Sequence, residues 1–375
     1  MGGSVGLRVL WISKASVTAS YRKKIALLAD AGVEIGVITG NEWGAWKFEP
    51  SSQDNTYIIY RQPQRLSGKN HLHWYPHVDR LIAEFSPDLI HIDEEHYSVV
   101  TYHLARLAVR RHVPFLFQSW QNIYKRYPFP FSAMQRYVFR HAATAIAGSE
   151  EVKDVLTRQD FAKRVEIVPL GVDTDIFFPT SADEARSHFG LKGRWAVGFV
   201  GRLVPEKGVM DLAQALIPLL RERPDWTWVV AGSGPVESDL RDKVGPLRVQ
   251  VQFIPWLGTA DMARLMNALD VLVVPSRTTP SWKEQFGRVI IEAMAVKLPV
   301  VAYDSGEIPR VLGDAGIVVQ EGDIRGLSSA LVALHQSPDL YVRLQTREFD
   351  RATHEFSQRQ VAAKLLTLYR QVLSA

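Results

Sequence analysis

A glycine-containing loop near residue 200 combines two cations with the start of a helix. The loop spans Phe199–Gly208 and leads into a segment of helical apolar spacing that begins at Val209. Its glycines allow close approach to the backbone, and Arg202 and Lys207 lie five positions apart. A helix N-terminus adds unpaired N–H groups and a positive dipole end. Together these features favour a diphosphate ligand, although a solvated loop with surface cations fits the same residues.

A second loop, Trp282–Ala295, carries two carboxylates separated by seven residues, Glu284 and Glu292. A helix starting near Gly287 places Glu284 at its N-terminal mouth. Eight residues of helix span at most about 12 Å, roughly the reach from a sugar across a pyrophosphate to a ribose. The alternative for Glu292 is a surface carboxylate favoured by the helix dipole. The apolar residues that follow it argue for buried neighbours and for a charge partner.

The elements that position these loops follow an α/β pattern. Short β-branched or apolar runs alternate with segments of helical spacing, which is typical of parallel sheets covered by helices on both faces. The predicted strands are Leu7–Ser13, Val33–Thr39, Tyr57–Arg61, Leu89–Asp93, Phe115–Ser119, Thr144–Ala147, Val165–Leu170, Trp195–Val200, Thr227–Ala231, Val249–Ile254, Val271–Val274, Val300–Tyr303 and Gly316–Val319. Predicted helices include Tyr21–Ala31, Tyr102–His112 and a closing helix over Phe356–Leu373.

The length of 375 residues favours two domains, because one hydrophobic core stops growing at roughly 250–300 residues. We expect a Rossmann-like N-terminal domain over residues 1–172, a linker over 173–180 and a second Rossmann-like domain over 181–355. The helix in 356–375 is expected to pack back toward the first domain. Two doubly wound domains facing a central cleft bind ligands at the carboxyl ends of their strands.

Composition excludes several classes of function. The chain has no Cys, so a disulfide scaffold, a thiol nucleophile and a Cys-ligated metal site are ruled out. Lys and Arg number 44 against 40 Asp and Glu, a mild net charge of +4. No apolar run approaches the roughly 18 residues of a membrane span. We expect a cytoplasmic protein.

A series of short motifs, in the same order along the chain, resembles that of glycosyltransferase family 4, the retaining glycosyltransferases of GT-B fold. The resemblance covers nearly the whole chain and is strongest from Val197 to Asp323. Its pieces are Gly201–Leu203, Glu206–Gly208, Ala231–Pro235, Asp270–Ser276, the Glu284 and Glu292 pair, Pro299–Val301, Gly306–Pro309 and Gly316–Val318. The resemblance implies a nucleotide-diphosphate sugar donor bound by the second domain and an acceptor bound by the first.

Residue roles carry over from that resemblance. Arg202 and Lys207 match the cations that hold the donor pyrophosphate. Glu284 matches the carboxylate on the hydroxyls of the transferred sugar, and Glu292 the one on the ribose. The donor-binding set it implies is Gly201, Arg202, Lys207, Gly232, Gly234, Pro255, Glu284, Phe286, Gly287, Arg288, Val289 and Glu292. Arg202, Lys207 and Glu284 are its expected catalytic members, with fixed cations stabilising the leaving diphosphate.

The N-terminal half departs from the family pattern in two loops. Many members have a Gly-Gly turn after the first strand, where this chain has Lys14 and Ser16 among small residues. Many also place a histidine after the strand Phe115–Gln118, where this chain has Trp120, Gln121 and Asn122. We expect these five residues to form the acceptor side. Gln121 or Asn122 is expected to donate a hydrogen bond to the donor or the acceptor, and Gln121 is the fourth expected catalytic residue beside Arg202, Lys207 and Glu284. Trp120 is expected to pack on a sugar face, the alternative being a buried tryptophan.

No metal and no cofactor is expected. The Asp173-Thr174-Asp175 motif resembles the family's interdomain linker rather than a metal site. The histidines at 71, 73 and 77 have only Asp79 nearby as a further ligand, which favours a loop or acceptor-side interpretation over zinc.

The stretch from Thr101 to Ser149 holds seven basic residues, many aromatics and no Asp or Glu. Such a mixture fits peripheral contact of residues 101–140 with an anionic membrane surface, or a grip on a lipid-linked or phosphorylated acceptor. Aromatic residues in the core and a solvated basic face fit equally well. Nucleic acid is not an expected partner.

The expected function is a metal-independent, retaining transfer of a hexosyl-type group to the hydroxyl of a saccharide or lipid-linked acceptor, in polysaccharide, glycolipid or glycoconjugate assembly. Retention is implied by the resemblance alone. Rival interpretations are a GT-B epimerase, a sugar phosphorylase or a non-catalytic nucleotide-sugar-binding partner. A dinucleotide oxidoreductase is disfavoured because Gly232-Ser233-Gly234 lacks the third glycine of that fingerprint.

Overall fold

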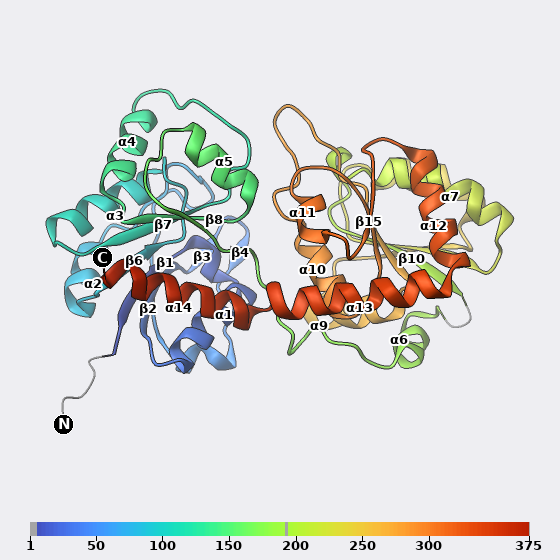
Figure 1. Ribbon diagram of the computed structural model, residues 1–375, viewed down its shortest axis with the longest axis horizontal. Coiled ribbons are helices and arrows are strands. Elements are labelled where there is room, and N and C mark those ends of the chain that lie inside the picture. The colour runs from blue at the N-terminus through green and yellow to red at the C-terminus, as the bar shows by residue number, and fades with distance from the viewer. Residues whose placement is uncertain (1–5, 192–193, 375) are drawn as a thin grey trace. The chain divides into compact units, whose positions relative to one another are not determined.

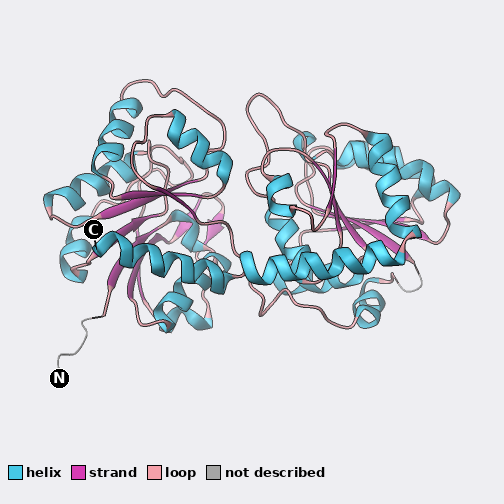
Figure 2. Ribbon diagram, viewed as in Figure 1, coloured by secondary structure: helices cyan, strands magenta, loops and turns pink. Residues whose placement is uncertain are grey.

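Runs of β-branched and aromatic residues form two separate parallel sheets in the computed structural model, which describes residues 6–191 and 194–374. The chain divides into two compact units. Unit 1 comprises the residues up to Gly171 together with the chain from Gln358 onward, and unit 2 is Val172–Ser357. Figure 1 labels the elements along the chain, and Figure 2 shows helices covering the sheets. Among the described residues, none of the helices combines the length and apolarity required to cross a bilayer.

Unit 1 has a seven-stranded sheet in the order β5-β2-β1-β6-β7-β8-β9. Its strands are β1 (Arg8–Ile12), β2 (Glu34–Gly40), β5 (Ile58–Gln62), β6 (Leu89–Ile92), β7 (Phe115–Ser119), β8 (Thr144–Ala147) and β9 (Val165–Ile167). Its helices are α1 (Ala19–Asp30), α2 (Val78–Phe85), α3 (Val99–Arg110), α4 (Phe131–His141), α5 (Glu150–Arg158) and α14 (Gln358–Ser374). A short hairpin, β3 (Glu42–Trp43) and β4 (Trp46–Lys47), stands apart from the sheet.

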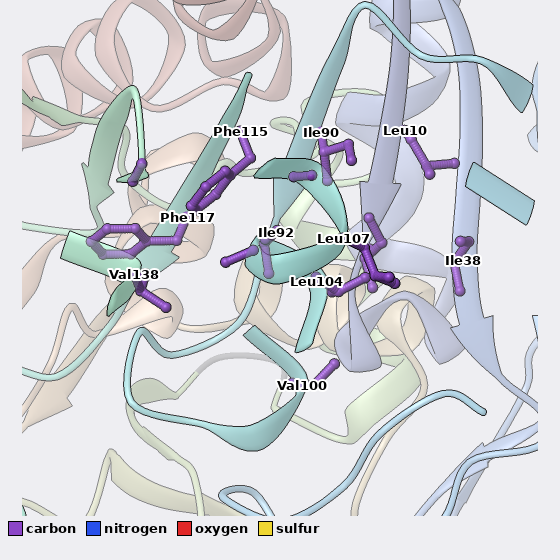
Figure 3. Packing of buried hydrophobic residues seen from close by; sticks show 14 of the residues in the cluster. Leu10, Ile38, Ile90, Ile92, Val100, Leu104, Leu107, Phe115, Phe117 and Val138 are labelled. Carbon is purple, nitrogen blue, oxygen red and sulfur yellow. The ribbon is translucent and has the colours of Figure 1, made fainter. Parts of the chain in front are cut away.

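Both faces of this sheet are buried, as parallel strands require. Alternate side chains such as Leu10, Ile90 and Phe117 pack with α2, α3, α4 and α5 on one face (Figure 3). The intervening residues, including Trp11 and Leu116, pack with α1 and α14 on the other face. The last helix of the chain therefore belongs to unit 1, where the Tyr369 hydroxyl lies 2.7 Å from Nδ1 of His91 in β6.

Unit 2 has a six-stranded sheet in the order β12-β11-β10-β13-β14-β15. Its strands are β10 (Trp195–Val200), β11 (Trp226–Ala231), β12 (Val251–Ile254), β13 (Val271–Val274), β14 (Val300–Tyr303) and β15 (Ile317–Val319). Its helices are α6 (Ala182–Phe189), α7 (Val209–Glu222), α8 (Glu237–Val244), α9 (Thr259–Ala268), α10 (Arg288–Ala295), α11 (Ile308–Leu312), α12 (Ile324–Gln336) and α13 (Pro338–Glu355). Helices α7, α8 and α12 pack on one face of this sheet.

Local capping explains several helix starts. The hydroxyls of Ser98, Ser149 and Ser181 accept a hydrogen bond from a first-turn N–H of α3, α5 and α6. Pro338 stands at the first position of α13, where its missing N–H costs nothing.

The predicted strands are confirmed, with β7, β8, β10, β13 and β14 at the predicted bounds. The closing helix begins at Gln358 rather than Phe356, and the β3–β4 hairpin was not predicted. Each unit is a doubly wound α/β sheet, so the predicted fold class is confirmed.

Candidate functional site

Each sheet has a switch point, where chain order reverses on the two sides of one strand. In unit 2 the first strand β10 lies between β11 and β13, and in unit 1 the first strand β1 lies between β2 and β6. Loops leaving the carboxyl ends of two such neighbouring strands diverge and leave room for a ligand. The charged candidate residues of unit 2 follow β10 and β13, while Gly232, Gly234 and Pro255 follow β11 and β12. The candidate residues of unit 1 follow β1 and β7, and Glu94 follows β6.

In unit 2 a lysine and a glutamate meet at the switch point. Nζ of Lys207, from the loop after β10, lies 2.6 Å from Oε2 of Glu284, from the loop after β13. The Ser276 hydroxyl donates to the same oxygen at 2.9 Å, and the ring of Trp282 lies 5.0 Å from the ammonium. The Lys207 side chain is 22% exposed and that of Glu284 10%. Ser276 and Trp282 therefore hold the pair in place, and Lys207 is the more exposed of its two members.

Two glycines allow these loops to approach so closely. Gly208 has φ +66°, and a Cβ there would lie 1.7 Å from the carbonyl oxygen of Pro275. Gly306, after β14, has φ +56°, and its Cβ would lie 2.1 Å from the carbonyl oxygen of Glu284. Real Cβ atoms do not tolerate such distances, so both positions require glycine. The backbone contact at Gly208 brings Lys207 beside the loop that carries Glu284.

Arg202, predicted to act with Lys207, is held more loosely. Its side chain is 63% exposed and its guanidinium lies 3.9 Å from Glu206 in the same loop. An exposed pair at this distance contributes little to stability. Arg202 therefore lies in the predicted loop but outside the Lys207–Glu284 pair.

Helix α10 begins directly after the pair. Gly287 is its N-cap, so the amides of the first turn, including those of Arg288 and Val289, have no intrahelical acceptor. Glu292 lies one turn along, and Oε1 accepts a hydrogen bond from Nε of Arg288 at 2.8 Å. Burial raises the pKa of Glu292 above its ordinary value, since the opposing effect of Arg288 is smaller. The charge partner predicted for Glu292 is therefore Arg288.

The remaining donor-side residues lie before α10 and in the loops after β10, β11 and β12. Phe286 is buried against Phe356, so only its backbone is available to a ligand. The Leu203 N–H donates to the Ser233 carbonyl at 2.9 Å, which brings the loop of Gly201 beside that of Gly232 and Gly234. Pro255 is exposed at the end of β12.

In unit 1 the acceptor-side residues lie after β1 and β7. Lys14 is 21% exposed and forms an ion pair with the buried Glu94, from the loop after β6. Ser16 is buried, and its carbonyl accepts from Nη1 of Arg22 at 2.6 Å. Trp120 is half-buried with its ring against Gly148, where a Cβ would lie 2.2 Å from the ring.

The two amides that follow Trp120 both have protein partners. Nε2 of Gln121 donates to the carbonyl of Ile123 at 2.8 Å. Asn122 is buried, and its Nδ2 donates to Glu151 at 3.2 Å. These hydrogen bonds stabilise the loop, and direct contact of either amide with substrate stays a prediction.

Sequence reasoning did not single out Glu94 or its neighbours Asp93 and Glu95. A run of three acids directly after an apolar strand was the available signal. His73, considered only as part of a histidine cluster, is buried with Nε2 3.4 Å from Oε1 of Glu94.

The Asp173-Thr174-Asp175 motif, considered as a possible metal site, forms a turn. In the linker motif, Oδ1 of Asp173 accepts from the backbone N–H of Asp175 at 3.1 Å, as a turn residue does. No group of three or more His, Cys, Asp or Glu side chains suited to a metal is present in the described part of the chain. Independence from metal stays a prediction.

Two family models match most of this chain. The model "Glycosyl transferases group 1" matches residues 194–337, and "Glycosyltransferase Family 4" matches residues 25–176. The chain is 28% identical over 285 residues to the 2-deoxystreptamine glucosyltransferase of Streptomyces kanamyceticus, covering 73% of this chain and 70% of that protein. It is 30% identical over 234 residues to the D-inositol 3-phosphate glycosyltransferase of Mycobacterium marinum, covering 60% and 49%.

The fold comparison agrees. The crystal structure of the Anabaena protein HepE in complex with UDP matches with a TM-score of 0.73 at 17% identity, over 97% of this chain and 100% of that one. With both halves matched by models of the same family and two doubly wound units of GT-B type, the chain belongs to glycosyltransferase family 4 and is a glycosyltransferase of GT-B fold.

Proposed function

We propose that this glycosyltransferase moves a hexosyl-type group from a nucleoside-diphosphate sugar to an acceptor hydroxyl with retention of anomeric configuration and without a metal ion. The observation that supports this most directly is the Lys207–Glu284 pair beside the N-terminus of α10. A cation beside a helix N-terminus suits a diphosphate, and a neighbouring carboxylate suits sugar hydroxyls. The relatives that act on 2-deoxystreptamine and D-inositol 3-phosphate suggest a cyclitol-type or saccharide acceptor.

In the proposed reaction the bond from the anomeric carbon to the diphosphate oxygen breaks, and the acceptor oxygen bonds to that carbon on the same face. The acceptor proton passes to the departing diphosphate. Lys207 and the first-turn amides of α10 stabilise the negative charge that develops on the diphosphate, and one such donor is typically worth about 10²- to 10³-fold in rate. Glu284 orients the transferred sugar and Glu292 the ribose.

The first test is a thermal-shift panel of UDP, GDP, ADP and TDP, each with and without EDTA. A ligand at 100 times its Kd stabilises by about 2.7 kcal/mol, which raises the midpoint by several degrees. We expect one nucleotide to shift the wild type with or without EDTA, and Lys207→Ala to lose the shift. Arg221→Ala, an exposed cation in the last turn of α7, is the matched control. No shift from any nucleotide would contradict the proposed donor site.

Transfer itself is measured with UDP-glucose and GDP-mannose against 2-deoxystreptamine, myo-inositol and D-inositol 3-phosphate. Proton NMR of the product reports whether the anomeric configuration of the donor is retained. An inverted product would overturn the retaining part of the proposal, and donor conversion without an acceptor would favour an epimerase.

We further propose that the protein acts from the cytoplasm and touches an anionic membrane surface through the loop after β7. Arg110 and Arg111 are less available to a membrane surface, because both form ion pairs with Asp79, at 2.9 and 2.8 Å. Within the loop, Lys125 and Arg126 are exposed and Phe129 is 83% exposed. A cationic loop with a projecting aromatic ring suits an anionic interface, where each basic residue contributes about 1 kcal/mol.

Co-sedimentation with phosphatidylserine-containing vesicles at low salt tests this contact. Lys125→Glu/Arg126→Glu should abolish binding, while the control Arg221→Glu in α7 should not. Equal binding to neutral and anionic vesicles would remove the proposal.

A further inference from the structure

Three consecutive acids follow β6, the strand beside the switch point of unit 1, and the outer two hold neighbouring loops. Oδ2 of Asp93 accepts the Ser13 hydroxyl at 2.8 Å, which anchors the loop after β1. Oε1 of Glu95 accepts the N–H of Trp120 at 2.8 Å, which anchors the loop after β7. One short acidic segment therefore organises both loops in which the acceptor-side residues were predicted.

The middle acid, Glu94, is the most enclosed of the three. Its side chain has no exposed surface, and its carboxylate pairs with the ammonium of Lys14 and also accepts the Lys14 N–H at 2.8 Å. His73 lies behind it, with Nε2 3.4 Å from Oε1 and no exposed surface of its own. Burial would raise the pKa of Glu94, but Lys14 and His73 outweigh that effect and lower it to about 2. Lys14 thus favours the ionised form of Glu94, whose side chain has no exposed surface.

Of Lys14, Glu94 and His73, only Lys14 has exposed side-chain surface. Its side chain is 21% exposed, and the ring of Trp43 lies 5.6 Å from the ammonium. Burial would lower the pKa of Lys14, but Glu94 together with Asp93 and Glu95 raises it. An ammonium has three donors and no acceptor capacity, so the ligand atom that meets it must be an oxygen that accepts a hydrogen bond.

We propose that Glu94 is a positioning residue, which holds the ammonium of Lys14 at the switch point of unit 1 so that Lys14 donates a hydrogen bond to an uncharged hydroxyl of the acceptor. The inference rests on the proposed transfer function and names the acceptor group that unit 1 recognises. Unit 2 shows the same arrangement, a lysine after the first strand paired with a glutamate from the loop across the switch point, at Lys207 and Glu284. The two pairs differ in exposure, since the Glu284 side chain is 10% exposed and that of Glu94 has no exposed surface.

The charges around Lys14 favour a hydroxyl over an anion. Glu94 neutralises the ammonium, and Asp93 and Glu95 add carboxylates to the same edge. A phosphate would be repelled by the surrounding carboxylates, and the single cation there is already neutralised by Glu94. An uncharged hydroxyl requires only the hydrogen bond that the ammonium donates. Glu94→Gln should therefore weaken the hydroxyl contact, because the ammonium loses its anchor, and should also relax discrimination against a phosphorylated acceptor.

The positioning step is tested without reference to activity. The full-length protein is treated with limiting acetic anhydride, and acetylation of each lysine is followed by peptide mass spectrometry. In Glu94→Gln, which preserves side-chain shape, we expect Lys14 to react at least about tenfold faster, since loss of the anionic partner lowers the fraction of the unreactive ammonium form. The exposed Lys69 should react at an unchanged rate. An unchanged rate at Lys14 would overturn the positioning role.

The acceptor step is tested by steady-state kinetics with UDP-glucose or GDP-mannose and myo-inositol or 2-deoxystreptamine. Glu94→Gln and Lys14→Met should each raise the acceptor KM by about tenfold or more, as expected for one lost hydrogen bond to a charged group, with donor KM unchanged. Glu34→Gln, which removes an ion pair with Arg8 at the opposite edge of the sheet, is the control.

The double variant Lys14→Met/Glu94→Gln should match Lys14→Met alone, because Glu94 acts through Lys14. Additive losses in acceptor KM would overturn the inference, as would tighter binding of D-inositol 3-phosphate than of myo-inositol by the wild type. The wild type could transfer sugar to none of these acceptors while Glu94→Gln still shows faster acetylation of Lys14. That result would contradict the proposed function and would still establish that Glu94 positions Lys14.

Discussion

The ammonium of Lys207 and the carboxylate of Glu284 face each other at 2.6 Å across the switch point of unit 2, although 77 residues separate them in the chain. The residue expected to hold the donor diphosphate is therefore neutralised by the residue expected to hold the transferred sugar. A bound nucleotide sugar has to share the lysine with the glutamate.

Glu284→Gln tests that sharing. Without the carboxylate, Lys207 is available to phosphate, so the nucleoside diphosphate should bind several-fold more tightly. Transfer should slow by about 10²-fold, because the sugar loses its orienting carboxylate. Titration calorimetry and steady-state kinetics measure the two effects. Glu222→Gln, at the exposed C-terminal end of α7, is the control, and weaker diphosphate binding in Glu284→Gln would contradict the prediction.

Glu292 should make nucleotide binding depend on pH. The ionised carboxylate is the better acceptor for ribose hydroxyls, and burial raises the pKa of Glu292. Affinity should therefore fall as the pH drops through this raised pKa, at a higher pH than for an ordinary glutamate. Glu292→Gln should bind more weakly near neutral pH and lose this dependence. Calorimetric Kd values between pH 4.5 and 8 measure it, and a parallel profile in the variant would rule out Glu292 as the titrating group.

Gly208→Ala should be strongly destabilising. The residue has φ +66°, and the new Cβ would meet the Pro275 carbonyl oxygen at 1.7 Å. Gly190→Ala is a matched control, because Gly190 has φ +68° and no atom of the described residues would lie within 4 Å of its Cβ. The control should lose about 1–2 kcal/mol, the cost of the left-handed conformation alone. Gly208→Ala should lose clearly more in urea unfolding, and equal losses would show that the backbone contact yields without cost.

Glu348 should lower stability at high pH. It is fully buried in α13, Oε1 accepts from the Val300 N–H at 2.8 Å, and Oε2 has no hydrogen-bond partner in the described part of the chain. Burial raises the pKa of Glu348 well above its ordinary value, against the smaller effect of the Val300 N–H. The folded pKa thus exceeds the unfolded one, so the stability from this group is complete below the unfolded pKa and is lost as pH rises through the folded one.

Glu348→Gln removes this titration. Relative to wild type, the variant should gain up to about 1.4 kcal/mol per pH unit between the unfolded and folded pKa values. Urea unfolding between pH 4 and 9 measures the difference. Glu355→Gln, an exposed position on α13, should show no such trend. A constant difference between Glu348→Gln and wild type would mean that Glu348 does not titrate with the raised pKa.

Local patterns account for much of what the sequence predicted correctly. Strands such as Phe115–Ser119 are continuous apolar runs, which a parallel sheet buried on both faces requires. The start of α10 could also be predicted, because Gly287 directly precedes an apolar segment of helical spacing. The two-residue strands of the β3–β4 hairpin were not, since so short a run has no detectable period.

Long-range choices of partner were beyond local patterns. Glu292 needed a partner, and Arg288 one turn away was within reach of a sequence argument. The acids after β6 were visible as a run, but nothing local indicates that Glu94 pairs with Lys14, 80 residues earlier, or that His73 closes the cluster from behind.

The amino-acid sequence by itself determined the alternation of strands and helices and the doubly wound class, and it predicted the loops after β10 and β13 as the donor side, because propensity, periodicity and motif spacing are properties of short segments. Only the tertiary structure decided which charges meet. Strand order placed β1 beside β6 and β10 beside β13, and that adjacency pairs Lys14 with Glu94 and Lys207 with Glu284. Burial, which depends on the whole fold, then left the Glu284 side chain 10% exposed and that of Glu94 with no exposed surface.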